Sequence, residues 1–223
     1  MSDLSYSCIL FDLDGTVIDT VADCACAINR TMEIFSFPKH TNDEVRSYLN
    51  NGARMLIRRA LPEKEAANEK LVDEVLATYI GFYRQCCTVD SKVYDGVMEM
   101  LEELYACGAK LGIVTNKPDV QTKIMIPHYF GDLFGYYEGN SDKAPVKPDA
   151  RRVDMALEAL GKKRSDAFFV GDSGVDVQTA KNAQIPSVGV AWGFAGTKAF
   201  EENVPTRVVY HASEITQIAK KGF

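Results

Sequence analysis

Long hydrophobic runs are missing from this 223-residue chain, and so is any excess of positive charge. No apolar stretch approaches the roughly 20 residues that span a bilayer. The N-terminus has no basic region followed by a long hydrophobic segment, so we expect no secretory signal. A net charge of −6 argues against nucleic acid or an anionic membrane as the main partner, because both attract clustered cations. We therefore expect a cytoplasmic protein.

Cysteine and histidine are present, but without the spacing that a zinc site requires. The 6 cysteines contain no CxxC pair, and none of the 3 histidines forms a spaced pair with them. Free, mostly buried thiols in a reducing compartment fit this pattern better. We therefore expect no zinc centre.

The stretch at residues 8–20, CILFDLDGTVIDT, breaks the local rules of a β-strand. Its apolar run at 8–11 predicts a buried strand, yet Asp12 and Asp14 follow one residue apart, with Gly15 next. Asp and Gly are depleted in strands, and two like charges this close repel each other. An ordinary strand with an Asp-Gly turn would explain Asp14 and Gly15 but not Asp12. We therefore expect a ligand site at this strand end.

The rest of the chain divides into two patterns. Residues 18–90 are helical throughout, with no convincing strand, a capping box at Thr41 and Glu44, and a long helix expected from Pro62 to about Tyr83. After residue 90, helices alternate with short apolar runs, which we interpret as strands at 110–115, 135–138, 167–170, 187–191 and 207–210. This alternation predicts an α/β fold with a parallel sheet. We expect a core formed by 1–17 and 91–223, and a helical cap formed by 18–90.

A parallel sheet brings distant residues to one edge. Asp12, Thr115 and Asp172 each end an apolar run, so they should emerge side by side. The helical segment leaves directly after the first strand and should therefore lie over the same edge.

Carboxylates dominate this predicted edge. Four would crowd into one crevice: Asp12, Asp14, Asp172 and Asp176. Such a cluster needs a cation, and ligands that are all hard oxygens favour Mg²⁺. An alternative without a metal, in which these acids only cap helices and turns, is credible for Asp176 but weak for Asp12 and Asp172 together.

These residue types fit phosphoryl transfer. A carboxylate at a strand end can attack phosphorus, which makes Asp12 the candidate nucleophile, and Asp14 can protonate the departing alkoxide. Thr115 and Asn116 can donate hydrogen bonds to a phosphoryl group.

A lysine should complete the site with positive charge. Lys147 precedes Pro148 at the expected start of a helix, where its ammonium group can reach the sheet edge. Lys143, on the same loop, is the alternative.

Together these motifs resemble the haloacid dehalogenase superfamily of phosphohydrolases. The pieces that carry the resemblance, in chain order, are DLDGT at 12–16, Thr115, Lys147-Pro148 and GDSGVD at 171–176. The resemblance implies a Rossmann-like core with sheet order 3-2-1-4-5 and a helical cap inserted after the first strand. It also implies Mg²⁺ bound by Asp12, the main-chain carbonyl of Asp14 and Asp172, with Asp176 and Ser173 just outside the ligands.

Within that superfamily the chain is similar to the phosphoglycolate phosphatase group. The similar segments include NNGARMLIRRAL in the cap and VAWGFAGTKAF near the C-terminus. This resemblance implies that Gly15 and Asn116 contact the substrate and that Arg54 reaches its distal carboxylate. A solvated helix cation is an equally good interpretation of Arg54. Gln184 stands where the family usually has glycine.

Three functions follow from these predictions. The first is a Mg²⁺-dependent phosphomonoesterase with an aspartyl-phosphate intermediate, acting on 2-phosphoglycolate or a similar small phosphorylated metabolite. The second is a phosphosugar mutase of the same superfamily, and the third is a non-catalytic binder of phosphorylated ligands. A dehalogenase is disfavoured, because a halide leaves without a proton and has no need of Asp14. Nothing in the sequence indicates an oligomeric state.

Overall fold

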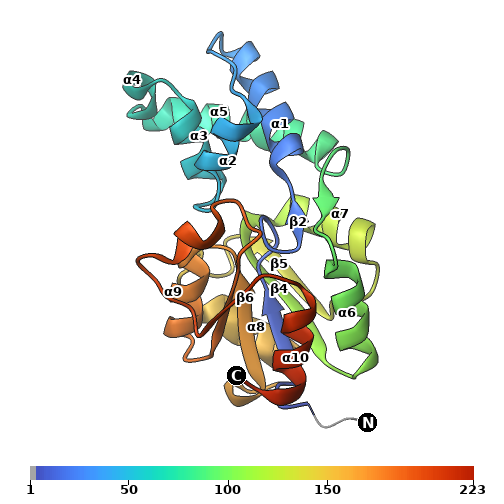
Figure 1. Ribbon diagram of the computed structural model, residues 1–223. Helices are drawn as coiled ribbons and strands as arrows, with labels where there is room; N and C mark the ends of the chain where they lie inside the picture. The colour runs from blue at the N-terminus through green and yellow to red at the C-terminus, as the bar shows by residue number, and fades with distance from the viewer. Residues whose placement is uncertain (1–3) are drawn as a thin grey trace.

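The computed structural model describes residues 4–223, and its main sheet has six parallel strands. Their order across the sheet is β5-β4-β1-β6-β7-β8 (Figure 1). The strands are β1 (Cys8–Phe11), β4 (Lys110–Pro118), β5 (Tyr136–Asn140), β6 (Ala167–Gly171), β7 (Ser187–Val190) and β8 (Arg207–Val209). Numbered within this sheet, the order is 3-2-1-4-5-6. The expected order 3-2-1-4-5 is therefore wrong in one detail, because β8 pairs with β7 and adds a sixth strand.

Alternate residues of β1 pack into two different hydrophobic cores, one on each face of the sheet. The run at 8–11 is therefore apolar at every position. Ile9 and Phe11 join the larger core, to which α6 (Val97–Ala106), α7 (Asp119–Phe130) and α10 (Ser213–Lys221) contribute. Cys8 and Leu10 face the smaller core with α8 (Arg151–Ala159) and α9 (Gly174–Asn182). A central parallel strand is covered on both faces in this way.

Five helices gather beyond one end of the sheet (Figure 1). They are α1 (Val21–Ile34), α2 (Asn42–Tyr48), α3 (Ala53–Ala60), α4 (Glu63–Ala66) and α5 (Glu69–Cys86). The capping box of Thr41 and Glu44 is confirmed at the start of α2. The single long helix expected from Pro62 is wrong: α4 ends at Ala66, and the side chain of Asn68 accepts a hydrogen bond from the N–H of Leu71 to begin α5.

Two short strands join this helical segment to the sheet domain. β2 (Ile18–Asp19) pairs antiparallel with β3 (Lys92–Val93), so residues 18–90 are not free of strands as expected. Two residues are too few to show the alternation by which a strand is recognised in sequence. The buried carboxylate of Asp23 accepts hydrogen bonds from the N–H groups of Asp90 (2.8 Å) and Ser91 (2.9 Å), which ties α1 to the returning chain.

Short 3₁₀ helices at Arg164–Asp166 and Gly196–Phe200 complete the described elements. All 6 cysteines are free, and those at positions 8, 24, 86 and 87 are buried. Among the described residues, no helix has the length and apolar character needed to cross a membrane.

Candidate active site

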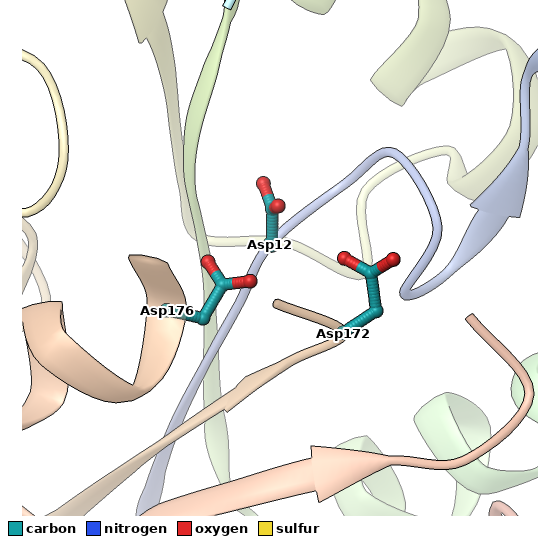
Figure 2. A group of neighbouring side chains, drawn as sticks. All are labelled: Asp12, Asp172 and Asp176. Atoms are coloured by element: carbon teal, nitrogen blue, oxygen red, sulfur yellow. The ribbon is translucent and has the colours of Figure 1, made fainter. Parts of the chain in front are cut away.

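Three carboxylates meet at the carboxyl ends of β1 and β6. Phe11, the last residue of β1, pairs with Val170 in parallel register. Asp12 follows directly and donates its N–H to the carbonyl of Val170 at 2.9 Å. In Figure 2 the side chains of Asp12, Asp172 and Asp176 extend to the same side of the strand ends. One carboxylate oxygen from each lies within 4.8 Å of the other two, and all three residues are buried. The predicted meeting of strand ends is therefore found.

Burial makes this cluster electrostatically unfavourable on its own. Desolvation, together with the charges of Asp176 and Asp12, raises the pKa of Asp172 well above its ordinary value. Burial also raises the pKa of Asp176, although Lys147 opposes the shift. The arrangement therefore favours a cation among these oxygens.

The donor set fits a magnesium ion. Oδ1 of Asp172 is buried and accepts no hydrogen bond from the described residues, whereas Oδ1 of Asp12 lies 2.9 Å from the Nζ of Lys147. The other oxygen of Asp172, Oδ2, accepts from the N–H of Phe194 at 3.0 Å. A cluster of buried carboxylate oxygens with no nitrogen or sulfur ligand among them matches the preference of Mg²⁺.

Lys147, and not Lys143, reaches the cluster. The Nζ of Lys147 lies 2.6 Å from Oδ1 of Asp176 and 2.9 Å from Oδ1 of Asp12. Burial acts to lower the pKa of Lys147, but the two carboxylates outweigh it and hold the pKa above its ordinary value. Lys143 instead pairs with Glu138 at 3.2 Å, with 63% of its side chain exposed. The buried ammonium group at the site is therefore that of Lys147.

Two side chains hold the loop that carries Lys147. The amide of Asn116 bonds to the backbone of Lys147, so its side chain does not serve only as a phosphate donor. Arg152, which is 1% exposed, donates to the carbonyls of Gly139, Ser141, Ala144 and Pro145. Sequence patterns did not identify Arg152, since helical periodicity does not show that a cation is buried.

Asp14 lies apart from the three clustered acids and has its own cation. Its Oδ1 accepts a hydrogen bond from Nζ of Lys117 at 2.7 Å, and the same ammonium group donates to the hydroxyl of Tyr83 on α5. Burial acts to lower the pKa of Lys117, but the charge and hydrogen bond of Asp14, together with the nearby thiols of Cys24 and Cys87, outweigh burial and hold the pKa above its ordinary value. The sequence offered a signal in TNKP at 115–118, but the expected strand stopped at 115, whereas β4 continues to Pro118.

The remaining predicted residues occupy well-defined places. Thr115 is buried, and its Oγ1 accepts from the N–H of Lys117 at 3.3 Å. Gly15 has φ +82°, and a Cβ there would clash with the carboxylate of Asp172, so only glycine suits both the backbone and the space. Ser173 donates from its N–H (3.0 Å) and its hydroxyl (2.6 Å) to Oδ2 of Asp176 at the start of α9.

Arg54 is not brought to the cluster. Its guanidinium pairs with Glu69 at 2.6 Å and also with Asp73, and 42% of the side chain is exposed. The cavity beside the carboxylates, of about 50 Å³, is lined by residues of the helical segment that include Gly52, Ala53 and Leu56 but not Arg54. The structure thus places Arg54 on the outer surface of α3.

Comparison with known proteins identifies the family. A family model described as haloacid dehalogenase-like hydrolase matches residues 9–190. The chain belongs to this family. A phosphoglycolate phosphatase from Colwellia psychrerythraea is 35% identical to this hydrolase over 192 residues, covering 83% of the chain and 84% of the relative. A second from Vibrio parahaemolyticus is 32% identical over 228 residues and covers 98% of each chain.

Solved structures show the same fold as this hydrolase. A predicted phosphoglycolate phosphatase from Haemophilus somnus is 26% identical, with a TM-score of 0.86 over 96% of this chain and 98% of the other. A haloacid dehalogenase-superfamily hydrolase of subfamily IA from Geobacter sulfurreducens is 23% identical, with a TM-score of 0.73 over 96% and 99% of the two chains. The α/β fold with its parallel sheet is confirmed.

Proposed function

We propose that this phosphatase is a Mg²⁺-dependent phosphomonoesterase that works through an aspartyl-phosphate and acts on 2-phosphoglycolate or a similar small phosphoester. Phosphatase activity follows from the family and its named relatives. One observation carries the mechanistic part: the carboxylate of Asp12 stands at a strand end beside the cavity, next to a buried lysine and two further buried carboxylates. A nucleophile, a cation and a metal site are thereby gathered around one point.

Asp12 is the proposed nucleophile. Its free oxygen attacks phosphorus, an O–P bond forms, and the bond between phosphorus and the ester oxygen breaks. Lys147 and the hydroxyl of Thr115 stabilise the negative charge of the transferred phosphoryl group. Asp12, Asp172 and the main-chain carbonyl of Asp14 would hold Mg²⁺, which supplies further charge neutralisation when it is bound.

Asp14 is the proposed acid and base. It gives a proton to the departing alkoxide and then removes one from the water that attacks the aspartyl-phosphate, which regenerates Asp12 and releases phosphate. Lys117 and Tyr83 fix the orientation of the Asp14 carboxylate for these transfers. We propose that Gly15 and the main chain at Asn116 contact the phosphate.

We propose that the chain forms two domains with different roles. Residues 1–17 and 91–223 form the phosphatase core, and 18–90 form a cap whose helices supply the outer wall of the cavity. A cavity of about 50 Å³ has room for a phosphoryl group and few further atoms, which supports a small leaving group. We also propose that the enzyme works in the cytoplasm.

A phosphate-release assay on Asp12→Asn tests the nucleophile. Wild type with Mg²⁺ should release phosphate from 2-phosphoglycolate, and the variant should lose at least 10³-fold in kcat while its circular dichroism spectrum is kept, in line with loss of a nucleophile. Retained turnover would overturn the assignment.

A screen of phosphoesters that includes analysis of glucose 6-phosphate formed from glucose 1-phosphate separates hydrolase from mutase. A wild-type protein that binds these esters without turnover would instead be a non-catalytic binder.

A further inference from the structure

We propose that Lys117 binds an anionic group on the leaving side of the substrate, so that the enzyme selects small phosphoesters carrying a second negative charge such as a carboxylate. The proposal rests on the phosphatase function proposed above and deepens it. Neither the family match nor the relatives assign a role to Lys117.

Of the cations that line the cavity in the described part of the chain, Lys117 is the one that is not bound to the cluster of Asp12, Asp172 and Asp176. Among the described residues that line this cavity, the only positively charged ones are Lys117 and Lys147. Lys147 is held between Asp12 and Asp176. Arg54 is held by Glu69 and Asp73 outside the cavity. An anionic leaving group therefore meets a single cation that is not already held between two carboxylates.

The ammonium group of Lys117 retains capacity for a further acceptor. It has three N–H donors, of which one is directed to Oδ1 of Asp14 and one to the hydroxyl of Tyr83. Its Nζ also lies 4.5 Å from the centre of the Tyr83 ring. The side chain is 1% exposed, so water screens the charge weakly and a carboxylate beside it would bind more strongly than at the surface.

The position of Lys117 corresponds to the leaving group and not to the phosphate. Asp14 is the residue that protonates the ester oxygen in the proposed mechanism, and Lys117 is bonded to that same carboxylate at 2.7 Å. Atoms attached to the ester oxygen would therefore extend toward Lys117 and Tyr83. The other walls on this side are apolar or weakly polar, formed by Leu49, Leu56 and Tyr79, so they offer no competing charge.

The test compares two esters of near-equal length, 2-phosphoglycolate and 2-hydroxyethyl phosphate. Wild type should prefer the carboxylate ester by at least 10-fold in kcat/KM. In Lys117→Gln, which can still donate to Asp14, this ratio should fall by roughly 10- to 100-fold, the range of one charge-assisted hydrogen bond, with much of the loss in KM for 2-phosphoglycolate. Glycolate should inhibit wild type more strongly than the variant.

Further variants keep the proposal falsifiable if Lys117→Gln does not fold. Tyr83→Phe keeps the charge of Lys117 but removes the hydroxyl that helps to hold its ammonium group in place. The preference for the carboxylate ester should therefore fall by a few-fold. A ratio unchanged in Lys117→Gln, or unchanged in Tyr83→Phe when the first variant is unfolded, overturns the proposal. It is also overturned if Arg54→Gln collapses the ratio while Lys117→Gln keeps it.

The two proposals fail in distinguishable ways. Wild-type hydrolysis of both esters without preference refutes the role of Lys117 and leaves the phosphatase mechanism standing. Hydrolysis of neither ester, nor of any other in the phosphoester screen, refutes the proposed function and this proposal with it.

Discussion

The side chain of Asn116 and the backbone of Lys147 exchange two hydrogen bonds. Oδ1 of Asn116 accepts from the N–H of Lys147 at 2.8 Å, and its Nδ2 donates to the Lys147 carbonyl at 3.2 Å. Both residues are buried. The strand that ends at the active site therefore fixes the loop that delivers the ammonium group.

Replacing Asn116 with Ala should reduce both stability and activity. The N–H and C=O of Lys147 would lose their partners, which costs about 1–3 kcal/mol for a buried polar group. We expect kcat to fall by roughly 10- to 100-fold as the ammonium group loses its fixed position, in the range of other positioning defects. Urea unfolding and steady-state kinetics measure the two effects.

The matched control is Asn182→Ala. Its Nδ2 donates to the carbonyl of Pro148 at 2.8 Å, next to Lys147 but on the exposed side. This change should alter the free energy of unfolding by less than about 1 kcal/mol and leave kcat near the wild-type value. Equal effects of the two substitutions would contradict the role assigned to Asn116.

Asp172→Asn should stabilise the metal-free protein and abolish its response to Mg²⁺. The pKa of Asp172 is raised in the folded state, chiefly by burial, so folding opposes loss of its proton. As pH rises above the ordinary value of 3.8, the unfolded chain loses that proton first. Wild-type stability relative to the variant should then fall by about 1.4 kcal/mol per pH unit until the folded pKa is reached.

Thermal melting in EDTA and in Mg²⁺ measures this effect. Wild type should gain stability with Mg²⁺ in proportion to RT ln(1 + [L]/Kd), whereas Asp172→Asn should gain little. The exposed Asp142→Asn serves as control and should keep the response to Mg²⁺. A variant that melts below wild type in EDTA at pH 8 would show that the buried charge is compensated by something other than a metal.

Gln184→Gly should stabilise the end of α9. Gln184 has φ +55° and follows the helix cap, where its N–H donates to Lys181 and the N–H of Ile185 donates to Ala180. This pair of bonds is a Schellman motif, whose left-handed residue is usually glycine. Removing the steric cost of the side chain should stabilise the protein by about 0.5–1 kcal/mol, despite losing an exposed bond from Arg164.

Comparison with Gln184→Ala isolates the backbone effect. Alanine loses the same bond from Arg164 but retains the strained conformation, so it should be no more stable than wild type. A rise of about 1–4 °C in Tm for glycine alone is expected. The same rise for alanine would assign the effect to the side chain.

Arg152→Met should destabilise the loop that carries Lys147. Four backbone carbonyls would lose a buried donor, and we expect a loss of about 3–5 kcal/mol together with lower kcat. Arg152→Lys should not restore the wild type, because an ammonium group cannot reproduce the guanidinium fork. Its exposed neighbour supplies the control: among residues 4–223 the side chain of Arg151 bonds only to Asp149, and Arg151→Met should cost less than about 1 kcal/mol in urea unfolding.

The sheet edge could be predicted from sequence because parallel strands all end on the same side. That geometry alone brought Asp12 and Asp172 together from positions 160 residues apart. The break between α4 and α5 could not be predicted in the same way, because residues 63–70, EKEAANEK, contain neither glycine nor proline and only the cap at Asn68 marks the break.

The burial of Lys117 and Arg152 could not be predicted from the pattern of apolar residues. A pattern of buried aliphatic residues shows which face of an element is covered, but it does not show that a cation shares the covered face. Lys117 lies where β4 departs from regular register with β5, between Val114 and Pro118, and its side chain donates a hydrogen bond to Asp14. Arg54 shows the converse, since its charge is paired with Glu69 and Asp73 on α5, which sequence spacing did not indicate.

The pairing of β2 with β3 makes the helical segment a closed excursion of the chain. Because Ile18 and Val93 are neighbours in a ladder, the excursion leaves and rejoins the sheet domain at one point, about 5 Å across. The five helices between β2 and β3 connect two antiparallel strands, as the loop of a β-hairpin does. We therefore expect that an insert whose ends match that spacing can replace these helices without disturbing the strand order beneath them.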